Sequence, residues 1–554
     1  MFVREKHING YAYLYLVESV REDGRTKQRI IKNLGRKEVV VASGELERLA
    51  ASVARYAERA IVLSQLVAGN PDGLACKRIG APLLFGRLWE ETSCRTVLEE
   101  LLATRGFEFP VERAVFVSVL HRIMVSGSDR ACEKWMADYD IPGVDGLALH
   151  HLYRAMAWLG EELDADQQAA ATGIAPRTIK DLIEERLFAR RRDLFSELSV
   201  VFLDTTSLSF TGAGGETLGE RGYSKDHRPD LMQMIVAVVI DAEGRPICSE
   251  MWPGNTADVT VLVPVIDRLR SRFGIGRVCV VADRGMISAA TIAVLEERGL
   301  EYVLGVRERT DTLVRSVVLE DGRPFTPLCI QRAKGKDTQL WVKEVKLNEV
   351  NRRYVVCRNE EEAEKDAADR RAIVAALDQQ LKRGDKALIG NSAYRRYLRA
   401  TSGGRVFEID PGKLADEARF DGIFVLRTNA RISPLQAVLR YRDLLQVEDL
   451  FRTAKALMRT RPIYHSSDAA IRGHVFCSFL ALVLRKELDQ RCRRAGFRPE
   501  WGDMLRDLDR LQEVEVSSGG RQIVLRTPAT GGIGPLFKAA GIALPANIRE
   551  PPPA

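Results

Sequence analysis

The alternation of apolar and polar positions divides the chain into segments with different periods. Residues 8–36 alternate with a period of two around a polar Glu22-Asp23-Gly24 turn, which predicts a β-hairpin. From residue 43 to about 195, apolar residues recur every three or four positions, the spacing of one face of a helix. The predicted helices cover residues 43–66, 83–103, 111–125, 147–163 and 176–195.

Beyond residue 198 the pattern changes to short apolar runs separated by helical segments. Strands are predicted at 198–204, 231–241, 246–251, 278–283 and 302–306, with helices at 257–272 and 288–298. Three antiparallel strands followed by alternating helix and strand predict an α/β domain with a mixed sheet.

Residues 308–430 interrupt this pattern. Short strands at 340–345, 353–357 and 422–427 flank a charged helix that begins with three glutamates at 360–362. Two long helices follow, at 434–460 and 468–495. The first begins at Ser433-Pro434, a cap residue followed by proline at the first helical position, and ends before Pro462.

Composition and charge narrow the class of protein. The chain has 554 residues, is 45% hydrophobic and contains no apolar run of about 18 residues, so no membrane span is predicted. Its nine cysteines are scattered and form no C-x-x-C pair, which predicts reduced thiols in a cytoplasmic protein rather than a zinc ribbon or disulfide framework. Between Phe451 and Arg498, eleven Lys or Arg stand against three acids. Such a block suits phosphate binding, although a solvated helix face has the same composition.

Two predicted strands end in a carboxylate, Asp204 and Asp283. Side chains at strand ends of an α/β sheet project into the crevice where ligands bind. Hard oxygen ligands without a matching His or Cys cluster suit Mg²⁺ or Mn²⁺. The alternative is that each aspartate is an ordinary turn or cap residue.

The predicted helix 434–460 carries a third acid. Tyr441, Glu448 and Lys455 are spaced seven residues apart and share one face. A glutamate between a tyrosine and a lysine can offer one ligand to a metal and two groups to a phosphate. An amphipathic surface helix would show the same spacing.

These residues occur in motifs with a recognisable order. They are Asp204-Thr205-Thr206-Ser207-Leu208, Ala282-Asp283-Arg284-Gly285, and Tyr-x6-Glu-x6-Lys at Tyr441, Glu448 and Lys455, supported by stretches at 222–230, 253–258 and 461–465. With them the chain resembles the DDE transposases of bacterial insertion sequences. Within these it resembles the insertion-sequence-four superfamily, and in particular the group labelled insertion sequence 1634.

The resemblance implies an α/β fold with an RNase H-like catalytic core and a mixed sheet. The first Asp would lie on the first strand, the second on the fourth, and the Glu on a helix after the sheet. The expected regions are 1–40, an N-terminal β-hairpin region; 41–195, a helical DNA-binding domain; 196–307, the first part of the core; 308–430, a β-rich insertion domain; 431–495, the second part of the core with the catalytic Glu; and 496–554, a C-terminal region.

The resemblance also implies a chemistry. Asp204, Asp283 and Glu448 would hold two Mg²⁺ ions, or Mn²⁺, about 3.5–4 Å apart. The enzyme would cleave DNA at the transposon ends and join the freed 3′-OH to target DNA. Its partners would be the terminal inverted repeats, the target DNA and a second copy of the chain, because two ends must be brought together. No membrane partner is expected, and association with the bacterial nucleoid would follow from DNA binding.

In the family, a Tyr, an Arg and a Lys of the Glu-bearing helix contact the terminal phosphate. Tyr441 and Lys455 match this pattern, but Leu444 stands at the Arg position. The candidates to replace that Arg are Arg440, Arg442 and Arg452.

Further residues carry two interpretations each. Lys225 and Arg228 either contact DNA or lie in a solvated turn. Asn255 and Asp258 either support the metal site or cap a helix. For Trp252, Trp341, His465 and His474 a structural role is the better interpretation.

Two other functions remain alternatives to an active transposase. One is a metal-dependent nuclease without strand transfer, and the other is a catalytically silent DNA-binding repressor or architectural factor. Retention of all three acids argues against the silent protein, because DNA binding does not require them.

Overall fold

A computed structural model describes most of the chain, in two compact units. One unit comprises Met1–Leu83, Asp138–Asp140 and Pro499–Ala554, and the other Leu84–Ala137 and Ile141–Arg498. The described residues are 2–22, 25–46, 48–49, 73–168, 175–191, 200–225, 228–274, 279–330, 338–347, 352–382, 394, 396–401, 406–454, 463–518 and 521–550.

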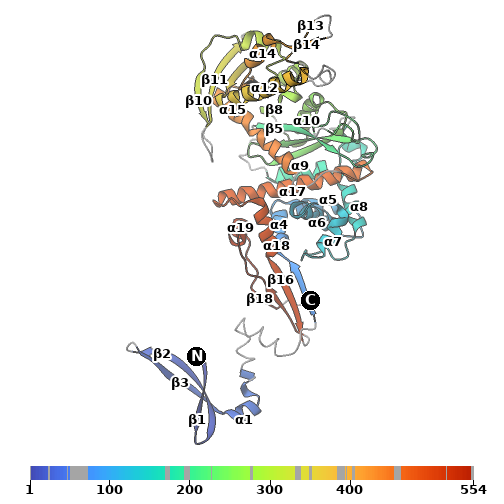
Figure 1. Ribbon diagram of the computed structural model, residues 1–554. Helices are drawn as coiled ribbons and strands as arrows, with labels where there is room; N and C mark the ends of the chain where they lie inside the picture. Colours follow the sequence, from blue (N-terminus) through green and yellow to red (C-terminus); the bar gives the residue numbers. More distant parts are fainter. Residues whose placement is uncertain are drawn as a thin grey trace. The chain divides into compact units, whose positions relative to one another are not determined.

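The first unit contains a three-stranded antiparallel sheet at its N-terminal end (Figure 1). Its strands are β1 (Phe2–Ile8), β2 (Tyr11–Glu22) and β3 (Arg25–Arg36), followed by α1 (Lys37–Ala42). The hairpin predicted for 8–36 is confirmed and gains β1 as a third strand. Asn9 and Gly10 join β1 to β2 with φ angles of 50° and 84°, the left-handed geometry of a two-residue hairpin turn. The helix predicted for 43–66 lies almost entirely outside the described residues.

A second sheet in this unit joins segments from distant parts of the sequence. It has the order β18-β17-β16-β4, from β4 (Gly73–Arg78), β16 (Gln512–Ser518), β17 (Arg521–Arg526) and β18 (Ile548–Arg549). The helices α18 (Trp501–Arg510) and α19 (Ile533–Ala539) accompany it. Antiparallel pairing of β4 with β16 places Arg78 opposite Gln512.

The second unit is built on a nine-stranded mixed sheet of order β10-β11-β12-β15-β9-β8-β5-β6-β7. The strands β5 (Val200–Ser209), β6 (Gln233–Ile240) and β7 (Pro246–Pro253) are antiparallel, whereas β8 (Cys279–Ala282) and β9 (Glu301–Gly305) run parallel to β5. The predicted α/β domain with a mixed sheet is confirmed.

Residues 308–430 extend the same sheet beyond β9. The strands β10 (Thr326–Ile330), β11 (Thr338–Leu347), β12 (Arg352–Arg358) and β15 (Ile423–Thr428) form an antiparallel series, and β15 pairs with β9. The remaining elements of this segment are the π-helical η3 (Val314–Val318), α12 (Glu360–Leu381), the hairpin of β13 (Leu398–Thr401) and β14 (Val406–Ile409), and α14 (Pro411–Ala418).

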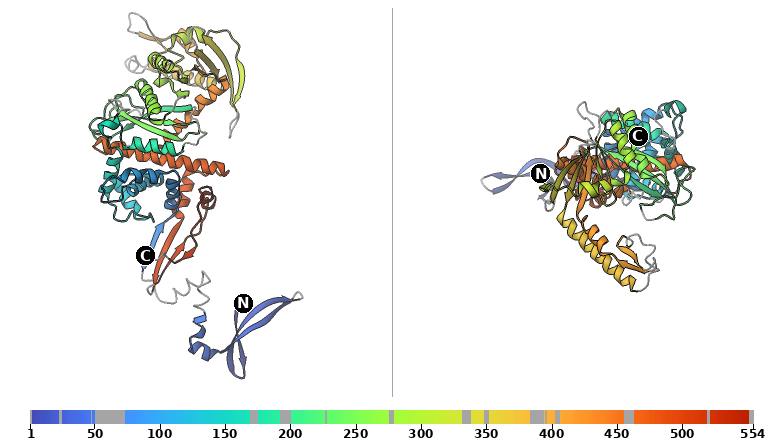
Figure 2. Two further views of the ribbon diagram at one scale, coloured as in Figure 1. Left: turned by 180° about the vertical axis from the view of Figure 1, so that it is seen from behind. Right: turned by 90° about the horizontal axis from the view of Figure 1, so that it is seen from above.

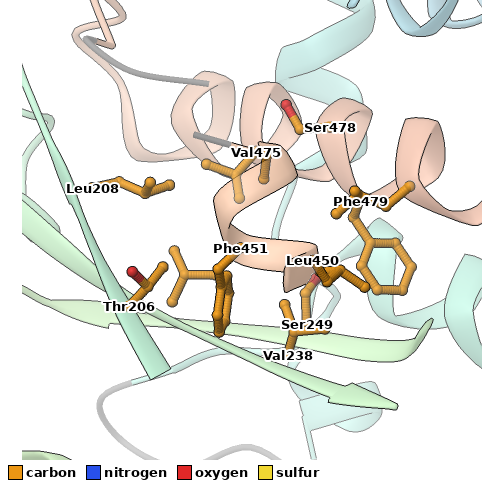
Figure 3. A pocket seen from close by; sticks show the side chains of 12 residues that line it. Thr206, Leu208, Val238, Ser249, Leu450, Phe451, Val475, Ser478 and Phe479 are labelled. Atoms are coloured by element: carbon orange, nitrogen blue, oxygen red, sulfur yellow. The ribbon is translucent and has the colours of Figure 1, made fainter. Parts of the chain in front are cut away.

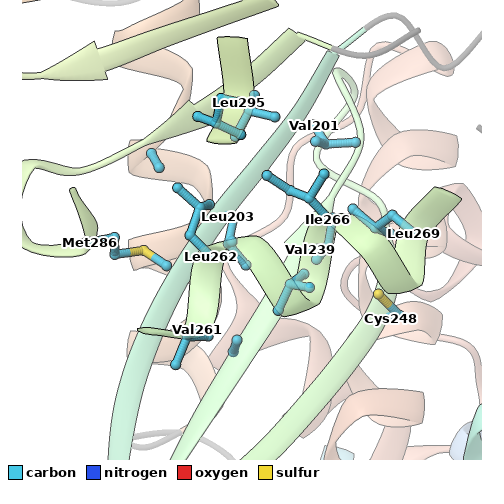
Figure 4. Packing of buried hydrophobic residues seen from close by; sticks show 14 of the residues in the cluster. Val201, Leu203, Val239, Cys248, Val261, Leu262, Ile266, Leu269, Met286 and Leu295 are labelled. Carbon is cyan, nitrogen blue, oxygen red and sulfur yellow. The ribbon is translucent and has the colours of Figure 1, made fainter. Parts of the chain in front are cut away.

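Helices cover both faces of the sheet. α10 (Asp258–Phe273) and α11 (Ala289–Glu297) pack on one face through a core of buried aliphatic residues that includes Val201, Leu203 and Leu262 (Figure 4). On the opposite face Leu450 and Phe451 face Thr206 and Val238 of the sheet around a cavity of about 30 Å³ (Figure 3). Because side chains alternate along a strand, Leu203 and Asp204 point to opposite faces.

The helix predicted for 434–460 is divided. α15 (Pro434–Asp443) is followed by Leu444 as its C-cap residue, and α16 (Leu445–Arg452) begins directly after it. Residues 455–462 lie outside the described part of the chain, so the predicted end of this helix is not described.

The long helix α17 (Asp468–Arg494) lies between the sheet and α6 (Val111–Met124) and α8 (Leu149–Leu159), as Figures 1 and 2 show. The other elements of the helical region are α4 (Gly80–Glu91), α5 (Cys94–Leu102), α7 (Asp129–Met136), the short η1 (Ala165–Gln168) and α9 (Ile179–Arg191). All nine cysteines are free thiols, as predicted. None of the described helices is both long and apolar enough to cross a bilayer.

Candidate active site

Asp204 and Asp283 lie on adjacent strands at the same level of the sheet. Parallel pairing of β5 with β8 places Leu203 opposite Ala282, so the two aspartates are the next residues on strands about 4.8 Å apart. β8 ends at Ala282, and Asp283 begins the short turn η2 (Arg284–Met286). Asp283 follows its strand as predicted, but the prediction that Asp204 ends its strand is wrong, because β5 continues to Ser209 in its pairing with β6. The two carboxylates meet where the pairing of β5 with β8 ends.

Glu448 comes to the same place from α16. Val447, Leu450 and Phe451 are buried, which anchors this helix on the sheet face that carries Asp204. Burial is the largest cause that raises the pKa of Asp204, to about 6; the negative charges of Asp283 and Glu448 add smaller contributions, while Lys225 and the backbone N–H of Thr205 oppose the shift. Carboxylates that perturb one another in this way form one electrostatic cluster.

Tyr441 connects α15 to this cluster. Its hydroxyl donates a hydrogen bond of 2.9 Å to Asp283 Oδ1. Burial, together with the charges of Asp283 and Glu448, holds the pKa of Tyr441 above its ordinary value, so the phenol keeps its proton. The ring passes so close to β9 that a Cβ on Gly305 would lie 2.4 Å from the hydroxyl oxygen.

The residues proposed for phosphate contact differ in position. Arg442 lines a pocket of about 270 Å³ together with Asp283, Tyr441 and Glu448. Arg452 is exposed and lies 3.9 Å from Asp449, and Arg440 lies beside the buried thiol of Cys279. Lys455 lies outside the described residues.

Leu444, at the family's Arg position, is buried with 4% exposure. It forms part of the apolar wall of the same pocket, with Ile330, Leu340 and Phe424 from the segment 308–430. Its side chain is packed against protein, so it offers nothing to a phosphate.

Lys225 and Arg228, close in sequence, have different surroundings. Lys225 Nζ lies 2.7 Å from both the carbonyl oxygen and Oγ1 of Thr205, and 3.1 Å from Asp258 Oδ2. Lys225 is thus bonded within the protein beside Asp204, where sequence reasoning expected a DNA contact or a solvated turn. Arg228 is more than half exposed and forms a bidentate pair with Asp230.

Asp258 is the first residue of α10 and does not cap it, because the N-cap residue is Ala257. Its carboxylate contacts Lys225 and Thr205 instead. Trp252 is buried in the core with 3% exposure, as expected, and Trp341 is partly buried on β11.

One group of potential metal ligands within 4.8 Å of one another occurs among the described residues: Asp129, His465 and His474. Arg122 already supplies a cation there, since its guanidinium lies 2.9 Å from His474 Nδ1 and 3.6 Å from Asp129 Oδ1. This arrangement supports the structural role expected for the two histidines. Asp204, Asp283 and Glu448 do not form so tight a group in the structure.

Comparison with known proteins identifies the family of the chain. A family described as "Transposase DDE domain" matches residues 195–484, more than half of the chain, so the chain is a DDE transposase. A second family, "IS1634 family transposase, N-terminal domain", matches residues 3–66. The chain therefore belongs to the IS1634-like DDE transposases.

Solved transposase structures are similar to the chain at low identity. They include a piggyBac transposase synaptic complex with hairpin DNA (11% identity, 78% of each chain, TM-score 0.36). A Mos1 mariner paired-end complex with Mn matches at 13% identity over 38% of this chain and 65% of that chain, with a TM-score of 0.13. A Mos1 paired-end complex with the left transposon end matches at 12% identity over 40% of this chain and 76% of that chain, with a TM-score of 0.13. No curated protein matches the sequence.

Proposed function

We propose that this transposase cleaves DNA at the ends of its element in a reaction that requires a divalent metal, and joins the freed 3′-OH to target DNA. The observation that carries the proposal is the convergence of Asp204, Asp283 and Glu448 from β5, β8 and α16. The negative charges of Asp283 and Glu448 reach Asp204 and, after its burial, contribute to its raised pKa.

The strand order supports an RNase H-like core. In β7-β6-β5-β8-β9, β6 is antiparallel to both of its neighbours and the three strands β5, β8 and β9 are parallel. We assign residues 196–307 and 431–495 to this core and 308–430 to an insertion whose strands continue its sheet. We assign 41–195 to end binding, with 1–40 as an N-terminal β-hairpin region and 496–554 as a C-terminal region.

The acid cluster suits a divalent cation. Three carboxylates close to one another repel, and a buried Asp204 bears a cost of ionisation that a bound cation would offset. Oxygen ligands select Mg²⁺ or Mn²⁺, and we assign Asp204, Asp283 and Glu448 as the residues that would hold two ions. When bound, such a pair activates water or a 3′-hydroxyl and stabilises the leaving oxygen.

Neighbouring groups orient these ligands. The backbone N–H of Thr205 donates to Asp204 Oδ1 at 2.7 Å, and the Tyr441 hydroxyl donates to Asp283 Oδ1 at 2.9 Å. Each bond occupies one oxygen and leaves the second available. Tyr441 stays protonated, so it remains a donor throughout the reaction.

Basic residues near the acids would bind the DNA backbone. Arg442 shares the 270 Å³ pocket with Glu448 and Tyr441, which makes it the best replacement for the Arg missing at Leu444. Lys455, Arg452 and the exposed Arg228 are further candidates. Because two ends must be joined to one target, we propose that the chain acts as a homodimer.

The experiment combines purified protein, Mg²⁺, labelled DNA from the inverted repeats flanking the gene, and a target plasmid. We expect cleaved ends and joined products. Cleavage without joining would favour a nuclease, and a gel shift with no cleavage under Mg²⁺ or Mn²⁺ would favour a silent DNA-binding protein.

Variants of the acids test the site itself. Asp204→Asn, Asp283→Asn and Glu448→Gln should each abolish cleavage while the protein still binds end DNA, because each removes a metal ligand and no phosphate contact. Near-normal cleavage by one variant would exclude that residue from the site.

A further inference from the structure

A closed polar network lies behind Asp204, on the side of β5 that faces α10. The Lys225 ammonium donates to the carbonyl oxygen and to Oγ1 of Thr205, both at 2.7 Å, and pairs with Asp258 Oδ2 at 3.1 Å. The Thr205 hydroxyl donates to Asp258 Oδ1 at 2.9 Å. An ammonium group has three protons, so all those of Lys225 are used inside the protein.

This network replaces hydrogen bonds that the sheet does not provide. Alternate residues of β5 direct their backbone groups toward β8, and the pairing with β8 ends at Leu203 and Ala282. The next such residue, Thr205, therefore has no strand partner on that side. Its N–H donates to Asp204 Oδ1, and its carbonyl accepts from Lys225. Thr205 thereby connects Lys225 to the carboxylate of Asp204.

Close backbone packing sets the position of Lys225. A Cβ on Gly222 would lie 2.0 Å from the carbonyl oxygen of Gly254, and one on Gly254 would lie 2.1 Å from that of Gln233. The amide of Gln233 holds the same loop by donating to Tyr223 O at 2.9 Å, and the Lys225 N–H donates to Ser207 Oγ at 3.1 Å. The segments 222–225 and 253–258, separate motifs in the sequence, are thus one structural feature.

We propose that Lys225 is a positioning residue that holds Thr205 and Asp258 together and so keeps the Asp204 carboxylate directed toward Asp283 and Glu448. Lys225 makes no contact with DNA. Thr205 is 2% exposed, so without the ammonium its carbonyl would be buried without a donor and the end of β5 would loosen. The catalytic consequence rests on the proposed function, whereas the structural consequence does not.

The test compares Lys225→Met and Lys225→Arg with wild type, using Lys382→Met as the control. Lys382 is the C-cap residue of α12, its side chain is 72% exposed, and it pairs only with Asp378 in the described contacts, so its loss removes the same charge elsewhere. Three quantities are measured on the full-length protein: the single-turnover cleavage rate at saturating protein and Mg²⁺, the affinity for end DNA as a function of salt, and backbone hydrogen exchange.

For Lys225→Met we expect the cleavage rate to fall by about 10- to 100-fold, the loss typical of a misplaced catalytic group. The affinity for end DNA should stay within about twofold, with an unchanged salt dependence, because no phosphate contact is lost. Lys225→Arg should recover part of the rate. Exchange should accelerate in residues 203–209 and at the start of α10, and remain unchanged in α6 and α17. Lys382→Met should behave as wild type throughout.

Two results would overturn the inference. Weaker DNA binding with a reduced salt dependence and a normal rate at saturation would make Lys225 a DNA contact. Wild-type cleavage and exchange in Lys225→Met would leave it without a positioning role. If the wild-type protein itself fails to cleave, the proposed function fails, and hydrogen exchange still decides whether Lys225 holds β5 and α10 together.

Discussion

Replacement of Gly305 by alanine tests the packing that places Tyr441 beside Asp283. The added Cβ would lie 2.4 Å from the Tyr441 hydroxyl oxygen, 3.0 Å from Cζ and 3.2 Å from Cε2. Restoring an ordinary contact requires the hydroxyl to move by about 1 Å. The ring cannot yield freely, because it is largely buried and its hydroxyl is bonded to Asp283.

Two effects of opposite sign compete in Gly305→Ala. Alanine in a strand is favoured over glycine by about 0.5–1 kcal/mol, whereas overpacking of a filled site costs about 1–3 kcal/mol. Disruption of the bond to Asp283 adds about 1 kcal/mol to the cost. We expect a net loss of about 1–3.5 kcal/mol in the free energy of unfolding, and a cleavage rate about 10- to 100-fold lower.

Urea unfolding and single-turnover cleavage measure these effects. The matched control is Gly86→Ala within α4, where the nearest atom to the new Cβ is Phe116 Cζ at 3.9 Å and alanine should stabilise the protein. The loss in free energy of unfolding caused by Gly305→Ala should be smaller in the Tyr441→Phe background. Without the hydroxyl, the ring atom nearest to the new Cβ is Cζ at 3.0 Å. A Gly305→Ala protein as stable and active as wild type, or an equal penalty in both backgrounds, would refute the reasoning.

The remaining predictions concern charge. The folded-state pKa of Asp204 is about 6, above the ordinary 3.8, so the stability that its protonated form contributes is present below pH 4 and is lost as pH rises through 6. Without metal, the free energy of unfolding of Asp204→Asn should therefore rise relative to wild type by up to about 3 kcal/mol between pH 4 and 7. Thermal unfolding in EDTA measures this difference, and a difference independent of pH would contradict the prediction. Arg442→Ala and Lys455→Ala should each weaken end binding and reduce the slope of log K against log salt by about one; an unchanged slope in a gel-shift titration would remove that residue from the interface. The Lys180 side chain is 4% exposed and bonded to Asp181 Oδ1 and Ser249 O, so Lys180→Met should lower the free energy of unfolding in urea by about 3 kcal/mol. A loss within error would mean that Arg272, whose guanidinium lies 3.1 Å from Asp181 Oδ1, balances that carboxylate alone.

Much of the fold follows from the period of the apolar residues. The runs that form β5, β6, β8 and β9 are long enough and apolar enough to be identified as buried strands, and the structure confirms them. The strand β1 was missed because its residues are mostly polar, although the Asn9-Gly10 turn signals a hairpin at its end. The sequence pattern does not predict the division of α15 from α16 at Leu444, because the seven-residue spacing of Tyr441, Glu448 and Lys455 continues through it.

The pairing between strands that are distant in sequence could not be predicted from the sequence pattern. Nothing local indicates that 73–78 pairs with 512–517, or that the strands of 308–430 continue the core sheet from β9. An apolar strand specifies that it is buried, but its backbone hydrogen-bonding groups are the same in every sequence. Its neighbour is therefore chosen by the packing of the whole domain.

The same division holds for the site. Local sequence determined that Asp283 follows a strand, that Glu448 comes seven residues after Tyr441 in a helical segment, and that the residues around Lys225 form a motif. It wrongly placed Asp204 at the end of its strand and Tyr441 and Glu448 on one continuous helix. Only the tertiary structure decided that the carboxylates interact, that Arg442 lines the pocket of Glu448 while Leu444 belongs to its apolar wall, and that the Lys225 ammonium is used within the protein. The physical reason is that residue type and spacing set what a side chain can do, while its partners are supplied by segments whose distance in sequence carries no information about their distance in space.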